Sequence, residues 1–475
     1  MKIDIGSRKM NMRTVASYTG GRLVGSGERA FRFAATDSRE ADADTMFVAL
    51  RGERTDGNSY IGAMPGVSCF LAERLPDNFD AQNSYAVVVP DTGNALLTLG
   101  EMYRKQLKDL RVYGVTGSVG KTTEKEMLSA VLAEKYKSLY KTDGNHNSII
   151  GLPMTLLSLS EKNDAAVLEM GMSARGEISR MSVAARPNVA IITNIGTSHM
   201  EMLGSRENLC RAKCEIADGM ADGSLLLLNG DEPLLRAAMP TFANLRTLTF
   251  GFGEGNDYMA SNIRFTEDRT YFDLVSGNQQ IADLSVYGIG KHLVMSALAA
   301  AAVALEEGMD AEAIRRGLAS YRSVNMRQQI LTAGKLTVIS DCYNASPESM
   351  SAAASVMGEL RNMTGKVAGA LLGDMLELGA TSDALHEETG YRMAKCGAVC
   401  LSAIGQYADA YRRGAIRGGM KEENIRVFAS RDEFAEATAF LCGVLPENGI
   451  LLVKGSRGMR LERAVEYLSE SVREH

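Results

Sequence analysis

The sequence has no pair of cysteines with C-x-x-C spacing, no long apolar run and no excess of positive charge. Because the seven cysteines form no metal-binding or redox motif, we interpret them as small buried side chains in a reduced protein. No run reaches the roughly 18 apolar residues that a membrane-spanning helix needs, so we expect no membrane span. The net charge of −6 argues against a nucleic-acid partner held through phosphate contacts. The first residues lack the apolar core of a secretory signal, so these absences together predict a cytoplasmic protein.

The chain does have enough length for several domains. Its 475 residues, 45% hydrophobic and 23% charged, have an ordinary globular composition, and this length favours roughly three domains. We predict an α/β protein with a small N-terminal domain over residues 1–90, a central domain over 91–322 and a C-terminal α/β domain over 323–475.

Apolar strand patterns separated by helical patterns fill the second and third domains. Near-continuous apolar strands of this kind predict parallel sheets with helices on both faces. Polar and apolar residues alternate around turn signals over residues 247–287, which predicts an antiparallel appendage to the central sheet. The predicted parallel strands are residues 165–169, 189–193, 224–228, 336–340, 366–372, 398–402 and 449–453.

The most informative segment is residues 114–123, which read G-V-T-G-S-V-G-K-T-T. It lies between a predicted strand at 111–113 and a predicted helix at 124–135. A glycine-rich turn between a strand and a helix lets backbone amides surround a phosphate, and the helix N-terminus adds its positive end. Lys121 can then reach the outer phosphates and Thr122 can bind Mg²⁺. The pattern predicts an ATP site, and the alternative is a glycine-rich turn without a ligand.

Chemically active side chains follow the strands of the central domain. Glu169 ends a predicted strand, where a carboxylate can hold Mg²⁺ on ATP phosphates. His199 follows the next strand and Lys213 comes fourteen residues later; taken alone, they also fit a structural histidine and a surface lysine. Asn145 and Asn147 lie in a turn that enters a helix and could bind an anionic ligand, although asparagine is also common at helix ends.

The third domain offers an arginine and an aspartate. Arg327 lies on the connecting segment and Asp341 directly follows a strand. An arginine can stabilise charge on a transferring phosphoryl group, and an aspartate can accept a hydrogen bond from a ribose hydroxyl. Spacing alone leaves a structural role open for both residues.

This set of motifs resembles the Mur ligase family of ATP-dependent enzymes that form peptide bonds. The family pattern T-G-x-x-G-K-T matches residues 116–122, and the resemblance runs over nearly the whole chain. The family's glutamate, histidine and lysine match Glu169, His199 and Lys213, and its linker arginine and C-terminal aspartate match Arg327 and Asp341. The lysine is typically carbamylated in these ligases, which would let Lys213 help hold a second Mg²⁺.

The resemblance implies a role for each matched residue. Lys121, His199, Lys213 and Arg327 would be catalytic, whereas Thr122, Glu169, His199 and carbamylated Lys213 would hold two Mg²⁺ ions. Residues 38–39 lie in a segment that looks like the family's UDP-sugar domain. The implied ATP contacts are Thr116, Gly117, Ser118, Val119, Gly120, Lys121, Thr122, Thr123, His292, Arg327 and Asp341; the implied UDP-substrate contacts are Ser38, Arg39, Asn145 and Asn147.

Within the family, the third domain is most similar to members that add D-alanyl-D-alanine to UDP-N-acetylmuramoyl tripeptide. Residues 341–350 and 373–379 match their D-x-Y-N-A-[NS]-P-x-S-M and G-D-M-x-E-L-G patterns, which places Tyr343 and Asn344 on the acceptor side. The resemblance implies a monomeric enzyme that uses ATP and these two substrates. The alternatives are another ligase of the superfamily, tripeptide-forming or folate-polyglutamylating, and a nucleotide-binding relative without ligase activity. Leu293 and Ser296 stand where the family usually has asparagines, at least one of which meets the adenine.

Overall fold

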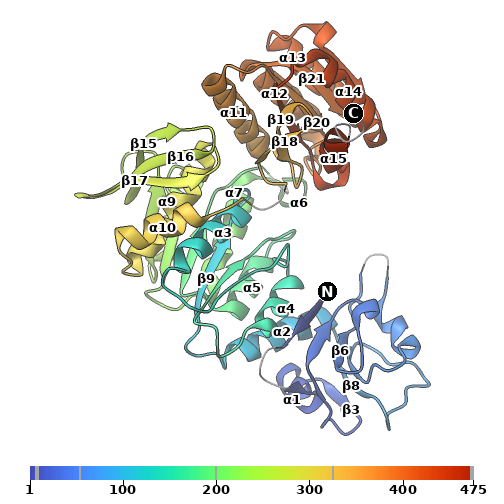
Figure 1. Cartoon of the computed structure of the whole chain (residues 1–475). Helices are drawn as coiled ribbons and strands as arrows, with labels where there is room; N and C mark the ends of the chain where they lie inside the picture. The colour runs from blue at the N-terminus through green and yellow to red at the C-terminus, as the bar shows by residue number, and fades with distance from the viewer. Residues whose placement is uncertain (6–9, 53–54, 198–199, 324–325, 471–475) are drawn as a thin grey trace.

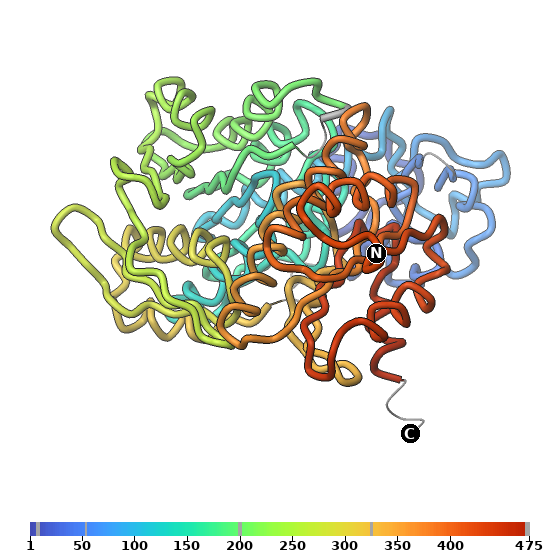
Figure 2. Tube along the Cα trace, turned by 90° about the horizontal axis from the view of Figure 1, so that it is seen from above, coloured from blue at the N-terminus to red at the C-terminus, as the bar shows by residue number. Residues whose placement is uncertain are grey.

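Three large β-sheets follow one another along the chain, each with its own helices (Figure 1), and strands β2 and β4 form a small two-stranded sheet in the N-terminal part. The computed structural model describes residues 1–5, 10–52, 55–197, 200–323 and 326–470. The N-terminal part and strands β15 to β17 of the central part lie at opposite ends of the molecule (Figure 2). No helix within these described residues is long and apolar enough to cross a membrane.

The N-terminal sheet has six strands in the order β1-β5-β6-β7-β8-β3. Strands β5 to β8 run parallel, and the two edge strands pair antiparallel with their neighbours. Val48 and Leu71 belong to the same buried cluster as Leu96 of helix α2, so this sheet is packed onto the central part. The elements are β1 (Lys2–Asp4), β2 (Met10–Asn11), α1 (Met12–Thr19), β3 (Arg22–Val24), β4 (Ala30–Phe31), β5 (Phe33–Ala35), β6 (Thr45–Val48), β7 (Cys69–Ala72) and β8 (Tyr85–Val88).

The central sheet has nine strands in the order β10-β11-β9-β12-β13-β14-β15-β16-β17. The first seven run parallel and the last two continue antiparallel. The strands are β9 (Arg111–Thr116), β10 (Leu139–Lys141), β11 (Ala165–Glu169), β12 (Val189–Ile192), β13 (Leu225–Asn229), β14 (Arg246–Gly251), β15 (Tyr258–Phe265), β16 (Arg269–Ser276) and β17 (Gln279–Tyr287).

Helices cover both faces of the central sheet, as the apolar strands predict. Successive residues of a strand point to opposite faces, and Ile192 and Ile191 accordingly lie in two different buried clusters. Helices α2, α4 and α5 pack on one face, and α3, α9 and α10 pack on the other. The helices are α2 (Thr92–Arg104), α3 (Lys121–Leu132), α4 (Gly151–Ser158), α5 (Glu177–Ala185), α6 (Met200–Leu203), α7 (Arg206–Cys214), α8 (Pro233–Ala238), α9 (Lys291–Glu306) and α10 (Ala311–Ser320).

The appendage predicted over 247–287 is confirmed only in part. Strand β14 lies inside that range but pairs parallel with β13, so it belongs to the main sheet. Only β15, β16 and β17 form the antiparallel pairs, and they extend the same sheet instead of forming a separate one. The pattern was misleading because β14 is buried only over its second half, and a partly exposed short strand does not reveal whether its neighbour runs parallel or antiparallel.

The C-terminal sheet has six strands in the order β18-β19-β23-β20-β21-β22, all parallel except the β18–β19 pair. Buried clusters lie on both of its faces. The elements are β18 (Gln329–Ala333), β19 (Leu336–Asp341), α11 (Pro347–Thr364), β20 (Ala368–Gly373), α12 (Ser382–Lys395), β21 (Ala398–Ile404), α13 (Ala408–Arg417), β22 (Ile425–Phe428), α14 (Phe434–Val444), β23 (Ile450–Lys454) and α15 (Glu462–Glu470).

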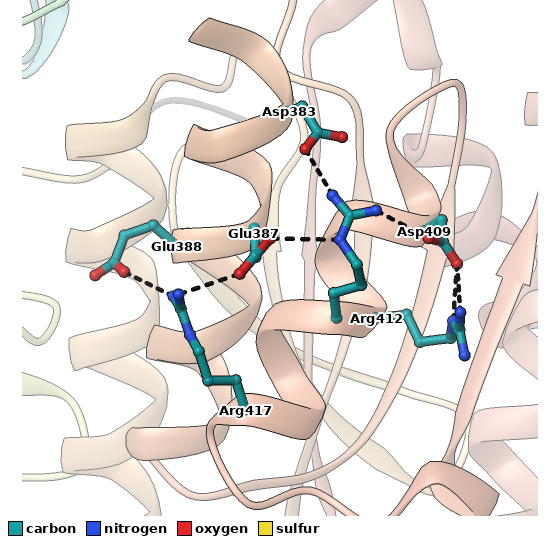
Figure 3. Close-up of polar contacts among 7 residues, drawn as sticks. Asp383, Glu387, Glu388, Asp409, Arg412 and Arg417 are labelled. Atoms are coloured by element: carbon teal, nitrogen blue, oxygen red, sulfur yellow. Dashed lines mark hydrogen bonds and ion pairs between the residues drawn. The ribbon is translucent and has the colours of Figure 1, made fainter.

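Helices α12 and α13 cross closely at the surface of this domain. A row of ion pairs joins them, among them Arg417 with Glu387 and Glu388 at 3.1 Å each (Figure 3). These side chains are well exposed to solvent, so each pair adds little stability. Tyr411 of α13 is fully buried, and its hydroxyl donates to the Gly373 carbonyl, so packing holds the crossing together.

Candidate active site

The loop between β9 and α3 has a backbone that only glycine can adopt at two positions. Gly117 has φ +149° and Gly120 has φ +84°. A Cβ on Gly117 would also lie 2.0 Å from Oγ1 of Thr193, which no side chain could tolerate. The loop is therefore shaped by its own glycines and by the strand beside it.

Two side chains at the end of β12 hold the loop in place. Oδ1 of Asn194 accepts a hydrogen bond from the Val119 amide at 2.9 Å, and the Thr193 hydroxyl donates to the Val119 carbonyl at 2.8 Å. Neither residue was predicted from the sequence. Their position directly after an apolar strand was the available signal, since the carboxyl ends of parallel strands meet at one edge of a sheet.

Helix α3 begins at Lys121, three residues earlier than predicted, and its first turn faces the loop. Its N-cap residue Gly120 provides no side-chain cap, so the first backbone amides are left for an anion. The Lys121 amine folds back and donates to the carbonyls of Gly117 and Ser118 at 2.8 and 3.2 Å. Burial lowers the pKa of Lys121, and the Glu169 carboxylate partly offsets this. The arrangement has the donors that a bound phosphate chain requires.

Glu169 at the end of β11 binds three side chains of the same site. It accepts hydrogen bonds from the Thr122 hydroxyl at 2.9 Å and from the Asn147 amide at 2.7 Å. The Lys125 amine lies 3.9 Å from its Oε2, and both side chains are 2% exposed. Lys125 was not predicted from the sequence, because a lysine in a helix is usually a solvated surface residue. A carboxylate, a hydroxyl and an amide form an oxygen donor set of the kind that Mg²⁺ prefers.

Lys213 is buried at the end of α7, so the interpretation as a surface lysine is wrong. Its side chain is 1% exposed. Burial, together with the positive charge of Lys121, holds the pKa of Lys213 well below its usual value. A neutral amine is a nucleophile, so its chemistry fits carbamylation. His199, its predicted partner, lies outside the described residues.

The C-terminal domain contributes Arg327 and Asp341. The Arg327 guanidinium lies over the Tyr343 ring, 4.1 Å from its centre. Oδ2 of Asp341 lies 2.6 Å from the amine of Lys454, which also donates to the Asn344 carbonyl at 2.9 Å. Lys454 was not selected from the sequence, although its place at the end of β23 was a usable signal.

One cavity of about 390 Å³ collects side chains from the central and C-terminal domains. His292 lines it from the start of α9, and burial lowers the pKa of His292 to about 4. Outside the cavity lining, Glu348 of α11 accepts a hydrogen bond from Thr197 of the central domain at 2.9 Å, which joins the two domains. The predicted site residues that line the cavity are Ser118, Val119, Gly120, Lys121, Thr122, Thr123, Asn145, Asn147, Glu169, His292, Arg327, Asp341, Tyr343 and Asn344.

Within the described part of the chain, five predicted residues do not line this cavity. The Thr116 hydroxyl donates to the Met170 carbonyl, and a Cβ on the neighbouring Gly117 would meet Thr193. Lys213 is buried and lies close enough to Lys121 for the charge of that amine to lower its pKa. Ser38 and Arg39 lie on the N-terminal domain, where Arg39 is 86% exposed and pairs with Asp37.

Comparisons with known proteins agree on one family. Residues 115–304 match the Mur ligase middle domain, and residues 326–457 match the Mur ligase, glutamate ligase domain. The chain is 36% identical to the UDP-N-acetylmuramoyl-tripeptide–D-alanyl-D-alanine ligase of Bacillus subtilis over 98% of this chain and 99% of that one. The Escherichia coli protein of the same name is 32% identical over 92% of this chain and 93% of its own length.

Solved structures give the same result. A crystal structure of MurF from Acinetobacter baumannii is 30% identical with a TM-score of 0.88, over 98% of this chain and 99% of that one. The structure of MurF ligase from Thermotoga maritima in complex with ADP is 27% identical with a TM-score of 0.80, over 93% of this chain and 98% of that one.

Proposed function

This chain belongs to the Mur ligase family, and we propose that it joins D-alanyl-D-alanine to UDP-N-acetylmuramoyl tripeptide with ATP in peptidoglycan precursor synthesis. One observation carries the proposal: the phosphate loop and Glu169 line the same cavity as Arg327, Asp341 and the 343–346 segment of the C-terminal domain. Such a cavity can hold ATP on one domain and the reacting groups of the other substrates against it.

ATP binds in this proposal with its phosphates on the amides at the start of α3. Lys121 leaves its loop carbonyls and contacts the outer phosphates, where its charge stabilises the transferring group. His292 lines the ATP cavity, and Asp341 accepts a hydrogen bond from a ribose hydroxyl. The ADP complex of the Thermotoga maritima relative supports nucleotide binding at this fold.

Two magnesium sites complete the proposal. Thr122 and Glu169 would hold one ion, and His199 with carbamylated Lys213 would hold the other. Bound Mg²⁺ supplies positive charge between the substrate carboxylate and the γ-phosphate, which otherwise repel each other. The depressed pKa of Lys213 supports the carbamate, because only an uncharged amine attacks CO₂.

The reaction then follows from the groups that meet in the cavity. A carboxylate oxygen of the tripeptide attacks the γ-phosphorus, ADP leaves, and an acyl phosphate forms. The amine of D-alanyl-D-alanine attacks the acyl carbon, and phosphate leaves with the bond electrons. Arg327 stabilises the phosphoryl charge, while Tyr343 and Asn344 face the acceptor. The C-terminal domain limits access of water, which would otherwise hydrolyse the acyl phosphate.

Further assignments concern the domain boundaries, the UDP end of the substrate, the oligomeric state and the cellular compartment. We propose domain boundaries near residues 90 and 322, because the three sheets fall on either side of them. Ser38 and Arg39 would contact the UDP end of the substrate, with Asn145 and Asn147 nearer the reaction. We also propose that the chain acts as a monomer. The free cysteines support a reduced cytoplasmic setting.

Acceptor-dependent phosphate release tests the function. The purified chain is incubated with ATP, Mg²⁺ and UDP-N-acetylmuramoyl tripeptide, with and without D-alanyl-D-alanine. We expect phosphate release only in the complete mixture, together with a pentapeptide product detected by mass. Glutamate, or meso-diaminopimelate with the dipeptide precursor, should give no release. Release with those acceptors instead would assign another ligase activity, and ATP binding without any release would favour a relative without ligase activity.

A further inference from the structure

Glu124 is a buried acid with no partner in the first turn of α3. Its side chain is 0% exposed, and neither carboxyl oxygen has a hydrogen-bond partner in the described part of the chain. By contrast, the buried carboxylates of Glu169 and Asp341 are both hydrogen-bonded. A buried polar group without a hydrogen-bond partner destabilises the folded state. A protein tolerates such a cost where a ligand supplies the missing partner.

Glu124 borders the cavity that holds the phosphate loop. It is three residues after Lys121, which places it about one helical turn beyond the phosphate-binding end. From the facing helix α9, Ser296 lines the same part of the wall, and its hydroxyl is near enough to influence Glu124. Leu293 lies one turn earlier on the same face of α9, since residues three apart on a helix are neighbours.

The wall around Glu124 combines apolar and polar groups in a way that suits a nucleotide base. Leu293, Phe250 and Ile289 line the cavity and are each at most 7% exposed, so they offer apolar contact. Asn229 also lines it, but its amide already donates to the Thr193 carbonyl. The carboxyl oxygens of Glu124, which have no hydrogen-bond partner among the described residues, therefore remain available for the polar edge of a flat ring.

We propose that Glu124 contacts the base of the bound nucleotide and selects adenine, its carboxyl oxygen accepting a hydrogen bond from the exocyclic amine. This inference rests on the proposed function for the identity of the nucleotide as ATP. Ser296 lies on the facing helix, where its hydroxyl can donate to a ring nitrogen. A carboxyl group keeps an oxygen acceptor in either protonation state, so the contact does not depend on the charge of Glu124.

The same contact disfavours guanine. Guanine carries a carbonyl oxygen where adenine carries its amine, so two acceptors would face each other in a buried site. A site that leaves such groups unpaired rejects the wrong ligand more strongly than an apolar site does. Glu124 thus acts as a specificity-determining residue, distinct from the groups that handle the phosphates.

Calorimetric binding of ATP and GTP to the full-length chain tests this directly. Glu124→Met keeps the length of the side chain but removes the acceptor, and we expect the Kd for ATP to rise by roughly 10- to 100-fold. The Kd for GTP should stay within about threefold, so selectivity falls by roughly the same 10- to 100-fold. Glu124→Gln keeps a carbonyl acceptor and should bind ATP within roughly threefold of the parent chain.

Three outcomes would overturn the proposal: equal affinity of the parent chain for ATP and GTP, an unchanged ATP-to-GTP ratio in Glu124→Met, or an equal loss for both nucleotides. Thermal unfolding without nucleotide checks that the variants fold, and Glu134→Ala, at an exposed ion pair just after α3, is the matched control. Because binding is measured without the other substrates, the result stands even if no D-alanyl-D-alanine is ligated.

Discussion

The amine of Lys454 lies 2.6 Å from Oδ2 of Asp341, and the two side chains are 1% and 10% exposed. They come from neighbouring parallel strands, β19 and β23, whose register pairs these two residues directly. The same amine donates to the Asn344 carbonyl, so one buried cation positions both the aspartate and the segment that follows it. This ion pair determines the shape of the C-terminal wall of the cavity.

Replacing Lys454 by methionine should destabilise the protein strongly. The variant leaves Asp341 buried without its counter-ion, which costs about 3–5 kcal/mol of unfolding free energy in comparable pairs. Urea denaturation followed by circular dichroism measures the loss. Lys335→Met, which breaks an exposed pair with Glu447, should change stability by less than about 1 kcal/mol. Equal effects of the two substitutions would show that the buried pair has no special role.

Lys121→Ala should remove turnover while preserving the fold. The side chain donates only to loop carbonyls, so its loss leaves the described packing intact, whereas phosphoryl charge goes unstabilised. We expect phosphate release to fall by roughly 10²- to 10³-fold or more. Lys135→Ala, which removes a partly exposed lysine paired with the buried carboxylate of Glu307, serves as the control and should retain activity. A near-normal rate for Lys121→Ala would rule out this placement of ATP.

Lys213→Ala should be inactive but rescued in part by formate or acetate. The small substitution leaves a space in which a short carboxylate can stand in for the carbamate oxygens. Phosphate release measured against carboxylate concentration should therefore rise and saturate. Lys121→Ala supplies the comparison and should show no rescue, because an anion cannot replace its positive charge. Failure to rescue Lys213→Ala at any concentration would argue against the carbamate.

Acidic pH should weaken the protein through His292. Its pKa falls from 6.5 to about 4 on folding because the ring is buried. A depressed histidine pKa contributes stability that is present above pH 6.5 and is lost as the pH falls toward 4, here at most roughly 3 kcal/mol. Melting temperatures measured from pH 7 to pH 5 should fall less for His292→Gln than for the parent chain. Some loss should remain, since the pKa of the buried His386 is lowered too. An equal fall in melting temperature for His292→Gln and the parent chain would show that His292 does not contribute to the loss of stability at acidic pH.

The stability of the contact between α12 and α13 should depend on the close packing of the two helices and not on the ion pairs at their surface. A Cβ on Gly414 would lie 1.8 Å from the Glu387 carbonyl oxygen, so Gly414→Ala forces the helices apart. We expect it to cost about 1–3 kcal/mol, or more, of unfolding free energy. Arg413→Ala removes the three surface ion pairs that Arg413 forms with Asp383, Glu387 and Asp409. This variant should lose less than about 1 kcal/mol of unfolding free energy. Chemical denaturation of both variants decides between packing and charge, and the reverse order would refute the packing account.

The sequence predicted correctly those features that depend on residues close together in the chain. The phosphate loop depends on glycines at fixed spacing between a strand and a helix, so residues 114–123 predicted its shape before any tertiary contact was known. The apolar strands likewise predicted a sheet buried on both faces. The direction of β14 was not predictable in this way, because parallel and antiparallel neighbours leave the same alternation in the sequence.

Residues that function through distant partners were harder to predict. Lys454 and Asp341 are 113 positions apart, and only the pairing of β19 with β23 brings them together. Lys213 reads as a surface lysine until α7 is packed against the sheet, where burial changes its pKa.

The sequence alone determined the phosphate loop, the three-part α/β organisation and the resemblance to a ligase family, because each depends on residues close together in the chain. Tertiary structure alone decided which charged groups are removed from water. Glu124 shows this most clearly, since a glutamate in the first turn of a helix is ordinarily solvated and becomes a buried, unpaired acid only when α9 packs over it. Desolvation depends on every neighbour in space, and that information is distributed over the whole chain.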